Sequence, residues 1–119
     1  MLAVVDDEEP IRKALTRLLR SAGLEVESFP SGVEFFESLQ DHRPDCVLLD
    51  LHMPGMDGFE VLGRLERERV QLPIIVTTGH DSAEARERAM AARPAAYLRK
   101  PVDDQTLLEA IRLATATHR

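Results

Sequence analysis

The sequence predicts an α/β fold in which five strand–helix units, (βα)5, form a doubly wound parallel sheet. Short apolar stretches alternate with amphipathic stretches of helical spacing five times along the chain. Strands that are separated by helices pair in parallel, and the helices then cover both faces of the sheet. The apolar stretches are also of two kinds, continuous and alternating, and this difference orders the strands.

The five predicted strands follow from these stretches. Continuous runs suit central strands that are buried on both faces, whereas alternating runs suit the edges of a sheet. The continuous runs are residues 2–5, 46–49 and 73–78, and the alternating runs are 24–29 and 95–99. In the first alternating run, Leu24, Val26 and Ser28 share one face. We therefore predict the flavodoxin-like order 2-1-3-4-5, with a ligand-binding switch point between the first and third strands.

The first two predicted helices have recognisable ends. The first carries apolar residues at helical spacing and stops at Gly23; these residues are Ile11, Leu15, Leu18, Leu19 and Ala22. The second opens at Ser31 and Glu34, which have the spacing of a capping box. We expect the apolar side of this second helix to consist of Val33, Phe36 and Leu39.

The last three helices are predicted in the same way. One starts at Asp57 and Glu60 and carries Phe59, Leu62 and Leu65. The next covers residues 82–92, with mainly alanine and Met90 on its apolar side. The last begins near Asp103 or Asp104, and its apolar residues are Leu107, Leu108, Ile111 and Ala114.

Composition limits the classes of function. At 119 residues the chain fits one domain spanning residues 1–119. The net charge is −6 and the basic residues are dispersed, which argues against direct binding to nucleic acid. No apolar run approaches the ~18 residues of a membrane span, and no signal peptide is recognisable, so we expect a cytoplasmic protein without membrane contact. The single cysteine, Cys46, is expected to be a small buried thiol.

Polar side chains stand where the predicted strands end. They are Asp6 and Asp7 after the first strand, Asp50 after the third, Thr77 and Thr78 at the end of the fourth, and Lys100 after the fifth. The carboxyl ends of parallel strands meet at one edge of the sheet, so these side chains should converge. Three carboxylates would repel one another without a cation, and an oxygen-rich site of this kind suits Mg²⁺. With a lysine and a hydroxyl beside them, the carboxylates could carry and hold a phosphoryl group.

Each of these signals also has an ordinary structural explanation. Asp6 and Asp7 could cap the helix that follows them, and Lys100 could be a solvated surface charge. Asp57 is expected to be only the cap of the helix that begins after it. Asp50 has no helix to cap, because the next helix starts several residues later. The joint placement at four strand ends favours a functional site.

Four sequence segments carry a family resemblance. They are VVDDE (4–8), LLDLHMPGMDG (48–58), IIVTTGH (74–80) and YLRKP (97–101). In this order and spacing they resemble the receiver domain of two-component response regulators, over essentially the whole chain. The resemblance implies a signalling phosphoacceptor rather than an enzyme, with self-phosphotransfer and autodephosphorylation as its only reactions.

The resemblance also implies a role for each matching residue at the strand ends. Asp50 would take a phosphoryl group from the phosphohistidine of a sensor histidine kinase or a phosphotransfer protein. Mg²⁺ would be held by Asp7, Asp50 and the backbone carbonyl of His52, with Asp6 acting through water. Lys100 would pair with the phosphoryl group.

A conformational switch is implied as well. Thr78, chosen over Thr77 because it directly precedes Gly79, would hydrogen-bond to the phosphoryl group. Tyr97 would then turn inward as Thr78 is drawn away. These movements would change the face made by the fourth helix, fifth strand and fifth helix. That face would act on an output domain, a downstream protein or, after phosphorylation, a second copy of the chain.

The resemblance further suggests that His52 and His80 flank the phosphoryl group and tune its lifetime. It also implies a cis peptide bond between Lys100 and Pro101, which would aim the lysine at the site.

The chain departs from the family after the fourth helix, where many members carry glycine and this chain has Arg93 and Pro94. The residue before a proline prefers extended geometry, so we expect no left-handed residue at Arg93.

Two other functions remain open on the sequence alone. A Mg²⁺-dependent phosphohydrolase with an aspartyl nucleophile would need a substrate pocket and usually a cap domain, for which 119 residues leave no room. The second is an interaction module that works without phosphorylation. Such a module would not need the full set of polar residues at the strand ends, and the presence of the full set in this chain argues against it.

Overall fold

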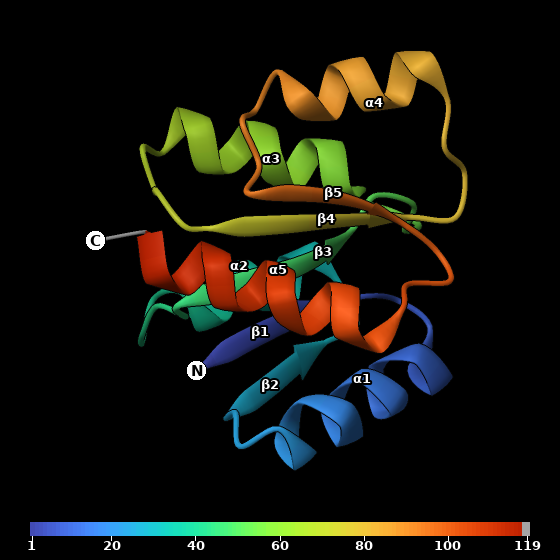
Figure 1. Cartoon of the computed structure of the whole chain (residues 1–119). Coiled ribbons are helices and arrows are strands. Elements are labelled where there is room, and N and C mark those ends of the chain that lie inside the picture. Colours follow the sequence, from blue (N-terminus) through green and yellow to red (C-terminus); the bar gives the residue numbers. More distant parts are fainter. Residues whose placement is uncertain (118–119) are drawn as a thin grey trace.

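All five predicted strands and all five predicted helices are present, in the predicted order. The structure is a computed structural model, and it describes residues 1–117. The elements are β1 (Leu2–Val5), α1 (Glu9–Ser21), β2 (Val26–Phe29), α2 (Gly32–Ser38), β3 (Cys46–Asp50), α3 (Gly58–Arg67), β4 (Ile74–Thr78), α4 (Ala83–Met90), β5 (Ala96–Arg99) and α5 (Asp104–Thr117) (Figure 1).

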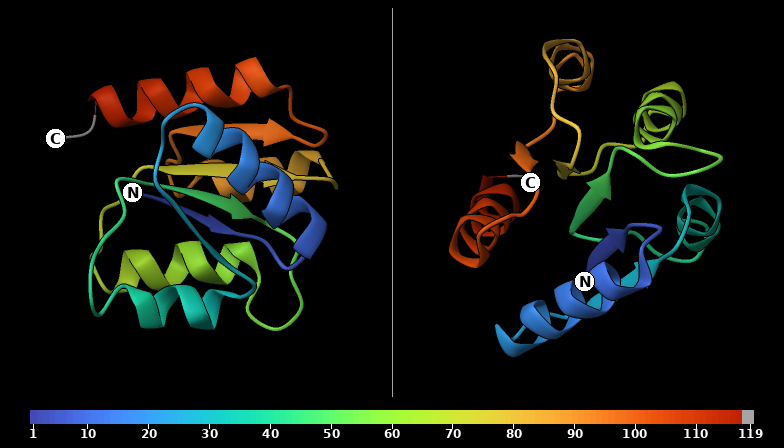
Figure 2. Two further views of the ribbon diagram at one scale, coloured as in Figure 1. Left: turned by 90° about the horizontal axis from the view of Figure 1, so that it is seen from below. Right: turned by 90° about the vertical axis from the view of Figure 1, so that its right-hand side faces the viewer.

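The five strands form one parallel sheet in the order β2-β1-β3-β4-β5, as predicted. The end-on view in Figure 2 shows α1 and α5 on one face of the sheet and α2, α3 and α4 on the other. The three central strands are buried along their whole length, whereas β2 and β5 are only partly buried. The two kinds of apolar run therefore predicted the central and edge strands correctly.

Alternate residues of the central strands contribute to two separate cores. Val5, Leu49 and Val76 pack under α2, α3 and α4, while Val4 and Ile75 pack under α1 and α5. The alternation arises because successive side chains of a strand point to opposite faces. Continuous apolar runs are thus required wherever both faces are covered.

Two short helices are rotated relative to the prediction. On α2 the expected core residue Val33 is 53% exposed, and Phe35 is fully buried instead. On α4 the expected core residue Met90 is 47% exposed, and Ala89 is fully buried. Phe35 contacts the rings of Phe29 and Phe36, so aromatic packing sets the rotation of α2. A small residue on α4 lets that helix lie close to the sheet.

The edge strand β2 also differs in detail from the expected pattern. Val26 is buried as predicted, but Ser28 on the same face is exposed. The strand is four residues long and lies at the edge of the sheet, where it pairs only with β1, so its later residues are less covered than those of a central strand.

The helix N-termini follow the capping signals. The Ser31 side chain accepts a hydrogen bond from the Glu34 N–H at 3.2 Å, and α2 begins there. Asp57 and Glu60 form a complete capping box at the start of α3. In α5, the Asp103 carboxylate accepts from the Thr106 N–H at 3.0 Å. The prediction that Asp57 is a helix cap is confirmed.

One backbone prediction is wrong. Arg93 has a φ of 54°, which is left-handed, although a proline follows it. The Arg93 N–H donates to the Met90 carbonyl at 3.0 Å, so this conformation closes the C-terminal turn of α4. Gly23, the predicted stop of α1, is also left-handed, with a φ of 86°. The Lys100–Pro101 peptide bond is cis, as predicted.

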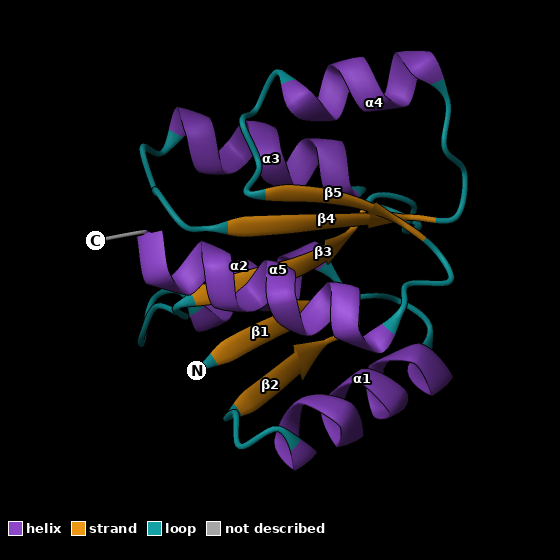
Figure 3. Ribbon diagram, viewed as in Figure 1, coloured by secondary structure: helices purple, strands orange, loops and turns teal. Residues whose placement is uncertain are grey.

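The carboxyl ends of β1, β3, β4 and β5 lie at the same edge of the sheet, as the strand arrows in Figure 3 show. Among the helices in residues 1–117, none is both long and apolar enough to cross a membrane.

Candidate functional site

Lys100 joins two of the acidic residues at this edge. Its Nζ lies 3.0 Å from Asp6 Oδ2 and 3.4 Å from Asp50 Oδ1. Both aspartate side chains are 3% exposed and the lysine is 20% exposed. Residues that follow β1 and β5 thus meet the last residue of β3, because the sheet order brings these three strand ends together.

The charges at the centre of the site are not balanced. Burial, followed by the nearby charge of Asp6, raises the pKa of Asp50, although Lys100 and the His52 N–H act in the opposite direction. Burial also disfavours the charged form of Lys100, but the hydrogen bond with Asp6 and the charge of Asp50 outweigh it and raise the pKa of Lys100. One ammonium group therefore does not fully compensate for the two buried carboxylates, and a second cation would be favoured.

The acidic residues after β1 provide a place for such a cation. Carboxylate oxygens of Asp6, Asp7 and Glu8 all lie within 4.8 Å of one another. Within residues 1–117, Asp7 Oδ1 is the buried side-chain oxygen or nitrogen that lacks a hydrogen-bond partner. A buried carboxylate oxygen without a partner is costly, and a hard divalent cation would satisfy it. The sequence had pointed to Asp6 and Asp7, whereas Glu8 was missed although it completes the acidic run.

The loop after β3 returns beside Asp50. The His52 N–H donates to Asp50 Oδ1 at 3.3 Å, and the Gly58 N–H donates to the Leu51 carbonyl at 3.0 Å. A Cβ atom on Gly58 would lie 2.6 Å from the Asp50 carbonyl oxygen and 2.6 Å from Leu51 Cα. Only glycine allows α3 to begin this close to the strand end. In the sequence, Gly58 is the last residue of the segment LLDLHMPGMDG (48–58) and lies at the first turn of the predicted helix, but it was given no role of its own.

The two threonines at the end of β4 differ in their contacts. Thr78 is fully buried, and its Oγ1 accepts a hydrogen bond from the His80 N–H at 3.0 Å. Thr77 donates its hydroxyl to the Leu49 carbonyl at 3.5 Å, within the sheet. The Thr78 hydroxyl hydrogen has no acceptor among the described residues, so it is available to a ligand.

His52 and His80 meet at the rim of the site. Both residues are exposed, and their ring centroids lie 4.9 Å apart with the planes at 86°. The sequence placed them two residues after Asp50 and Thr78 but did not predict their mutual contact.

Tyr97 makes its polar contacts with residues other than Asp6, Asp50 and Lys100. Its hydroxyl donates to Asp81 Oδ1 at 2.8 Å, and the Arg86 guanidinium lies 5.3 Å from the centre of its ring. Asp81 also has Arg99 at 3.9 Å. The residue predicted to turn inward is therefore bonded to the loop that follows β4 in this structure.

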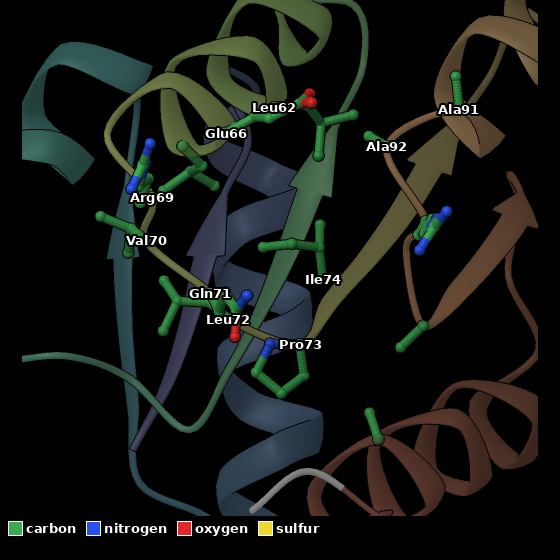
Figure 4. A pocket seen from close by; sticks show the side chains of 14 residues that line it. Leu62, Glu66, Arg69, Val70, Gln71, Leu72, Pro73, Ile74, Ala91 and Ala92 are labelled. Atoms are coloured by element: carbon green, nitrogen blue, oxygen red, sulfur yellow. The ribbon is translucent and has the colours of Figure 1, made fainter.

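A cavity of about 720 Å³ lies at the other end of the sheet. Figure 4 shows its lining, which comes from the C-terminal part of α3, the loops after α3 and α4, the start of β4 and one residue of α5. The lining combines apolar residues such as Leu62 and Ile74 with the charged residues Glu66, Arg69 and Arg93. None of the residues at the carboxyl ends of the strands contributes to it, so it is separate from the polar site.

Comparison with known proteins agrees with this arrangement. The family model described as "Response regulator receiver domain" matches residues 2–112. Nodulation protein W of Bradyrhizobium diazoefficiens is 39% identical over 116 residues, which are 98% of this chain and 51% of that protein. Transcriptional regulatory protein FixJ of Rhizobium meliloti is 37% identical over 112 residues, or 94% of this chain and 55% of FixJ. The chain thus spans about half the length of these relatives.

Solved structures show the same fold. The crystal structure of FixJ-N superimposes with a TM-score of 0.91 at 35% identity, covering 99% of this chain and 94% of that one. A response regulator receiver protein from Burkholderia phymatum gives a TM-score of 0.85 at 41% identity, covering 98% and 95%. With a family match across nearly its whole length and relatives of this identity, the chain belongs to the response regulator receiver domain family.

Proposed function

We propose that Asp50 accepts a phosphoryl group from the phosphohistidine of a sensor histidine kinase or a phosphotransfer protein, in a reaction that requires Mg²⁺. The observation that supports this most directly is the partly buried Lys100 ammonium between the buried carboxylates of Asp6 and Asp50. A structural ion pair needs one carboxylate, whereas this lysine faces two, and a further acidic oxygen on Asp7 has no partner among the described residues. Such a site is set up for a cation and an incoming anion.

In the proposed reaction an oxygen of Asp50 forms a bond to phosphorus while the bond from phosphorus to the donor's imidazole nitrogen breaks. Lys100 pairs with a phosphoryl oxygen, and the free hydroxyl hydrogen of Thr78 is donated to another. Asp7, Asp50 and the His52 carbonyl would hold Mg²⁺, with Asp6 acting through water. The bound ion would offset negative charge on the phosphoryl oxygens.

The signal would leave the site through Thr78 and Tyr97. When Thr78 moves toward the phosphoryl group, Tyr97 gives up its hydrogen bond with Asp81 and turns inward, which alters the face formed by α4, β5 and α5. A two-state equilibrium that the phosphoryl group shifts is sufficient for this. The partners of that face would be an output domain, a downstream protein or a second copy of the chain.

The phosphoryl lifetime would depend on the histidines at the rim. His52 and His80 stand beside the residues that contact the phosphoryl group, so their imidazoles can shield phosphorus from water or orient an attacking water. Replacing either by alanine should change the autodephosphorylation rate several-fold.

Intact-mass measurement after incubation with acetyl phosphate and Mg²⁺ tests the phosphoacceptor. The wild-type protein should gain the mass of one phosphoryl group, and Asp50→Asn should gain none. Asp45→Asn is the matched control, because Asp45 is an exposed carboxylate five residues earlier, at the other end of β3. EDTA should abolish the gain.

Equal phosphorylation of wild type and Asp50→Asn would refute the assignment of the phosphoacceptor. Multiple turnover of a phosphomonoester would favour a phosphohydrolase. Absence of any mass gain in the wild type would favour an interaction module that works without phosphorylation.

A further inference from the structure

The contact between His52 and His80 has a feature that phosphotransfer does not require. Both imidazoles are exposed, yet within residues 1–117 neither ring has a hydrogen-bond or ion-pair partner. Their main chains are fixed, because the His52 N–H donates to Asp50 Oδ1 and the His80 N–H donates to Thr78 Oγ1. Two imidazoles with unused nitrogens are therefore held side by side on rigid anchors.

The spacing of the rings matches that of two ligands on one metal ion. Imidazole nitrogens bind Zn²⁺ at about 2.0–2.1 Å, so two rings on the same ion have centroids roughly 4.5–5.2 Å apart for angles between square and tetrahedral. The observed separation of the centroids is 4.9 Å. Both rings are exposed, so each has room to turn about its side-chain bonds and present a nitrogen to a shared ion.

The chemistry of this pair differs from that of the acidic cluster nearby. Carboxylate oxygens suit Mg²⁺, whereas imidazole suits Zn²⁺, Cu²⁺ and Ni²⁺. The net charge of −6 also favours the approach of a cation to this surface. The remaining coordination positions would be filled by water, because the described residues place no third acidic, histidine or cysteine ligand within reach of both rings.

We propose that His52 and His80 form a two-imidazole binding site for a divalent transition-metal ion of the Zn²⁺ class. This site is distinct from the acidic cluster in its ligands, and it does not depend on whether Asp50 accepts a phosphoryl group.

Zn²⁺ titration followed by calorimetry and NMR tests the proposal. Saturating Mg²⁺ is present throughout, so that the acidic cluster is blocked. One Zn²⁺ should bind per chain, and the imidazole resonances of His52 and His80 should shift together and first. Loss of a residue that only hydrogen-bonds to a metal ligand typically costs 10–100-fold in metal affinity. Because His52→Ala and His80→Ala each remove a direct ligand, each should weaken binding at least about tenfold.

His42→Ala is the matched control. His42 is also exposed, but its Nε2 lies 3.0 Å from Glu27 Oε1, and it precedes β3, whereas His52 follows that strand. This variant should bind Zn²⁺ like the wild type. Circular dichroism checks that the variants are folded, and the resonance shifts of the wild-type protein provide a test that needs no variant.

Wild-type affinity in either His52→Ala or His80→Ala would overturn the proposal. So would a titration in which the resonances of His42 or of Asp6, Asp7 and Glu8 move before those of the pair.

Discussion

Replacing Lys100 by methionine should destabilise the protein by about 3 kcal/mol near neutral pH in the absence of Mg²⁺. At an effective dielectric constant of about 20, each ion pair at 3.0–3.4 Å is worth roughly 5 kcal/mol before desolvation is counted. Desolvation of the ammonium removes much of this gain, and breaking a buried ion pair typically costs about 3–5 kcal/mol. Because the lysine is 20% exposed, the lower end of that range applies.

The loss should depend on pH in a defined direction. Burial and the charge of Asp6 raise the pKa of Asp50, and Lys100 opposes this rise. Without Lys100, the folded state holds the Asp50 proton more tightly than the unfolded chain does. The stability of the variant then falls as the pH rises above the ordinary carboxyl range, and its deficit relative to wild type narrows as the pH is lowered toward that range.

Urea unfolding at several pH values, with EDTA and then with Mg²⁺, measures these effects. A loss of about 3 kcal/mol corresponds to a fall in Tm of roughly 10 °C for a chain of this size. Mg²⁺ should restore part of the loss, because a cation again faces the carboxylates. Lys13→Met is the matched control, since Lys13 is the other lysine of the chain and its pair with Glu9 is exposed.

Lys13→Met should have little measurable effect. If Lys100→Met were no more destabilising than Lys13→Met at neutral pH in EDTA, then Lys100 would not stabilise the buried carboxylates, and the electrostatic account of the site would be wrong.

Two backbone predictions follow from the same structure. Gly58→Ala should cost about 1–3 kcal/mol, because its Cβ would press on backbone atoms of Asp50 and Leu51, whereas Gly63→Ala, whose Cβ meets only the flexible Arg67 side chain at 3.3 Å, should be neutral or stabilising in urea unfolding. Equal effects of the two alanines would contradict the close packing behind Asp50. Arg93→Gly should stabilise by up to about 1 kcal/mol, because relief of the left-handed strain exceeds the added freedom of the unfolded chain. A lower urea midpoint for Arg93→Gly would show that the arginine side chain stabilises this turn.

Much of the fold and of the polar site could be predicted from the sequence, because both follow from periodicity. Continuous apolar runs identify strands covered on both faces, and the sheet order then determines which strand ends are neighbours. Asp6, Asp50 and Lys100 are far apart in the chain, yet once the topology is known their convergence needs no knowledge of side-chain packing. Their ion pairs confirm that convergence.

Features that depend on packing could not be predicted in this way. On a helix of seven or eight residues, neighbouring apolar positions such as Val33 and Phe35, or Ala89 and Met90, fit the helical period about equally well. The buried member is decided by what the opposing surface accepts, and that surface belongs to other segments. The contact between the His52 and His80 rings is of the same kind, because it depends on how two loops from different strands approach each other.

The wrong prediction at Arg93 has a different origin. The preference of a residue before proline for extended geometry is opposed there by the sharp turn that the chain makes between α4 and β5. Gly23 after α1 and Arg69 after α3 are left-handed, with φ values of 86° and 55°. Each is followed by a residue whose N–H donates to the carbonyl five positions earlier: Leu24 to Leu19 at 3.1 Å and Val70 to Leu65 at 2.9 Å. After α4 that position is Pro94, which has no N–H, so this longer bond is missing and the bonds from Ala92 to Ala89 and from Arg93 to Met90 close the turn. The chain must still turn sharply there, because Ala95 donates to the Ile74 carbonyl at 2.7 Å to start β5 beside β4. Pairing of the edge strand therefore outweighs the preference of a pre-proline residue for extended geometry, and it does so with an arginine where glycine would be less strained.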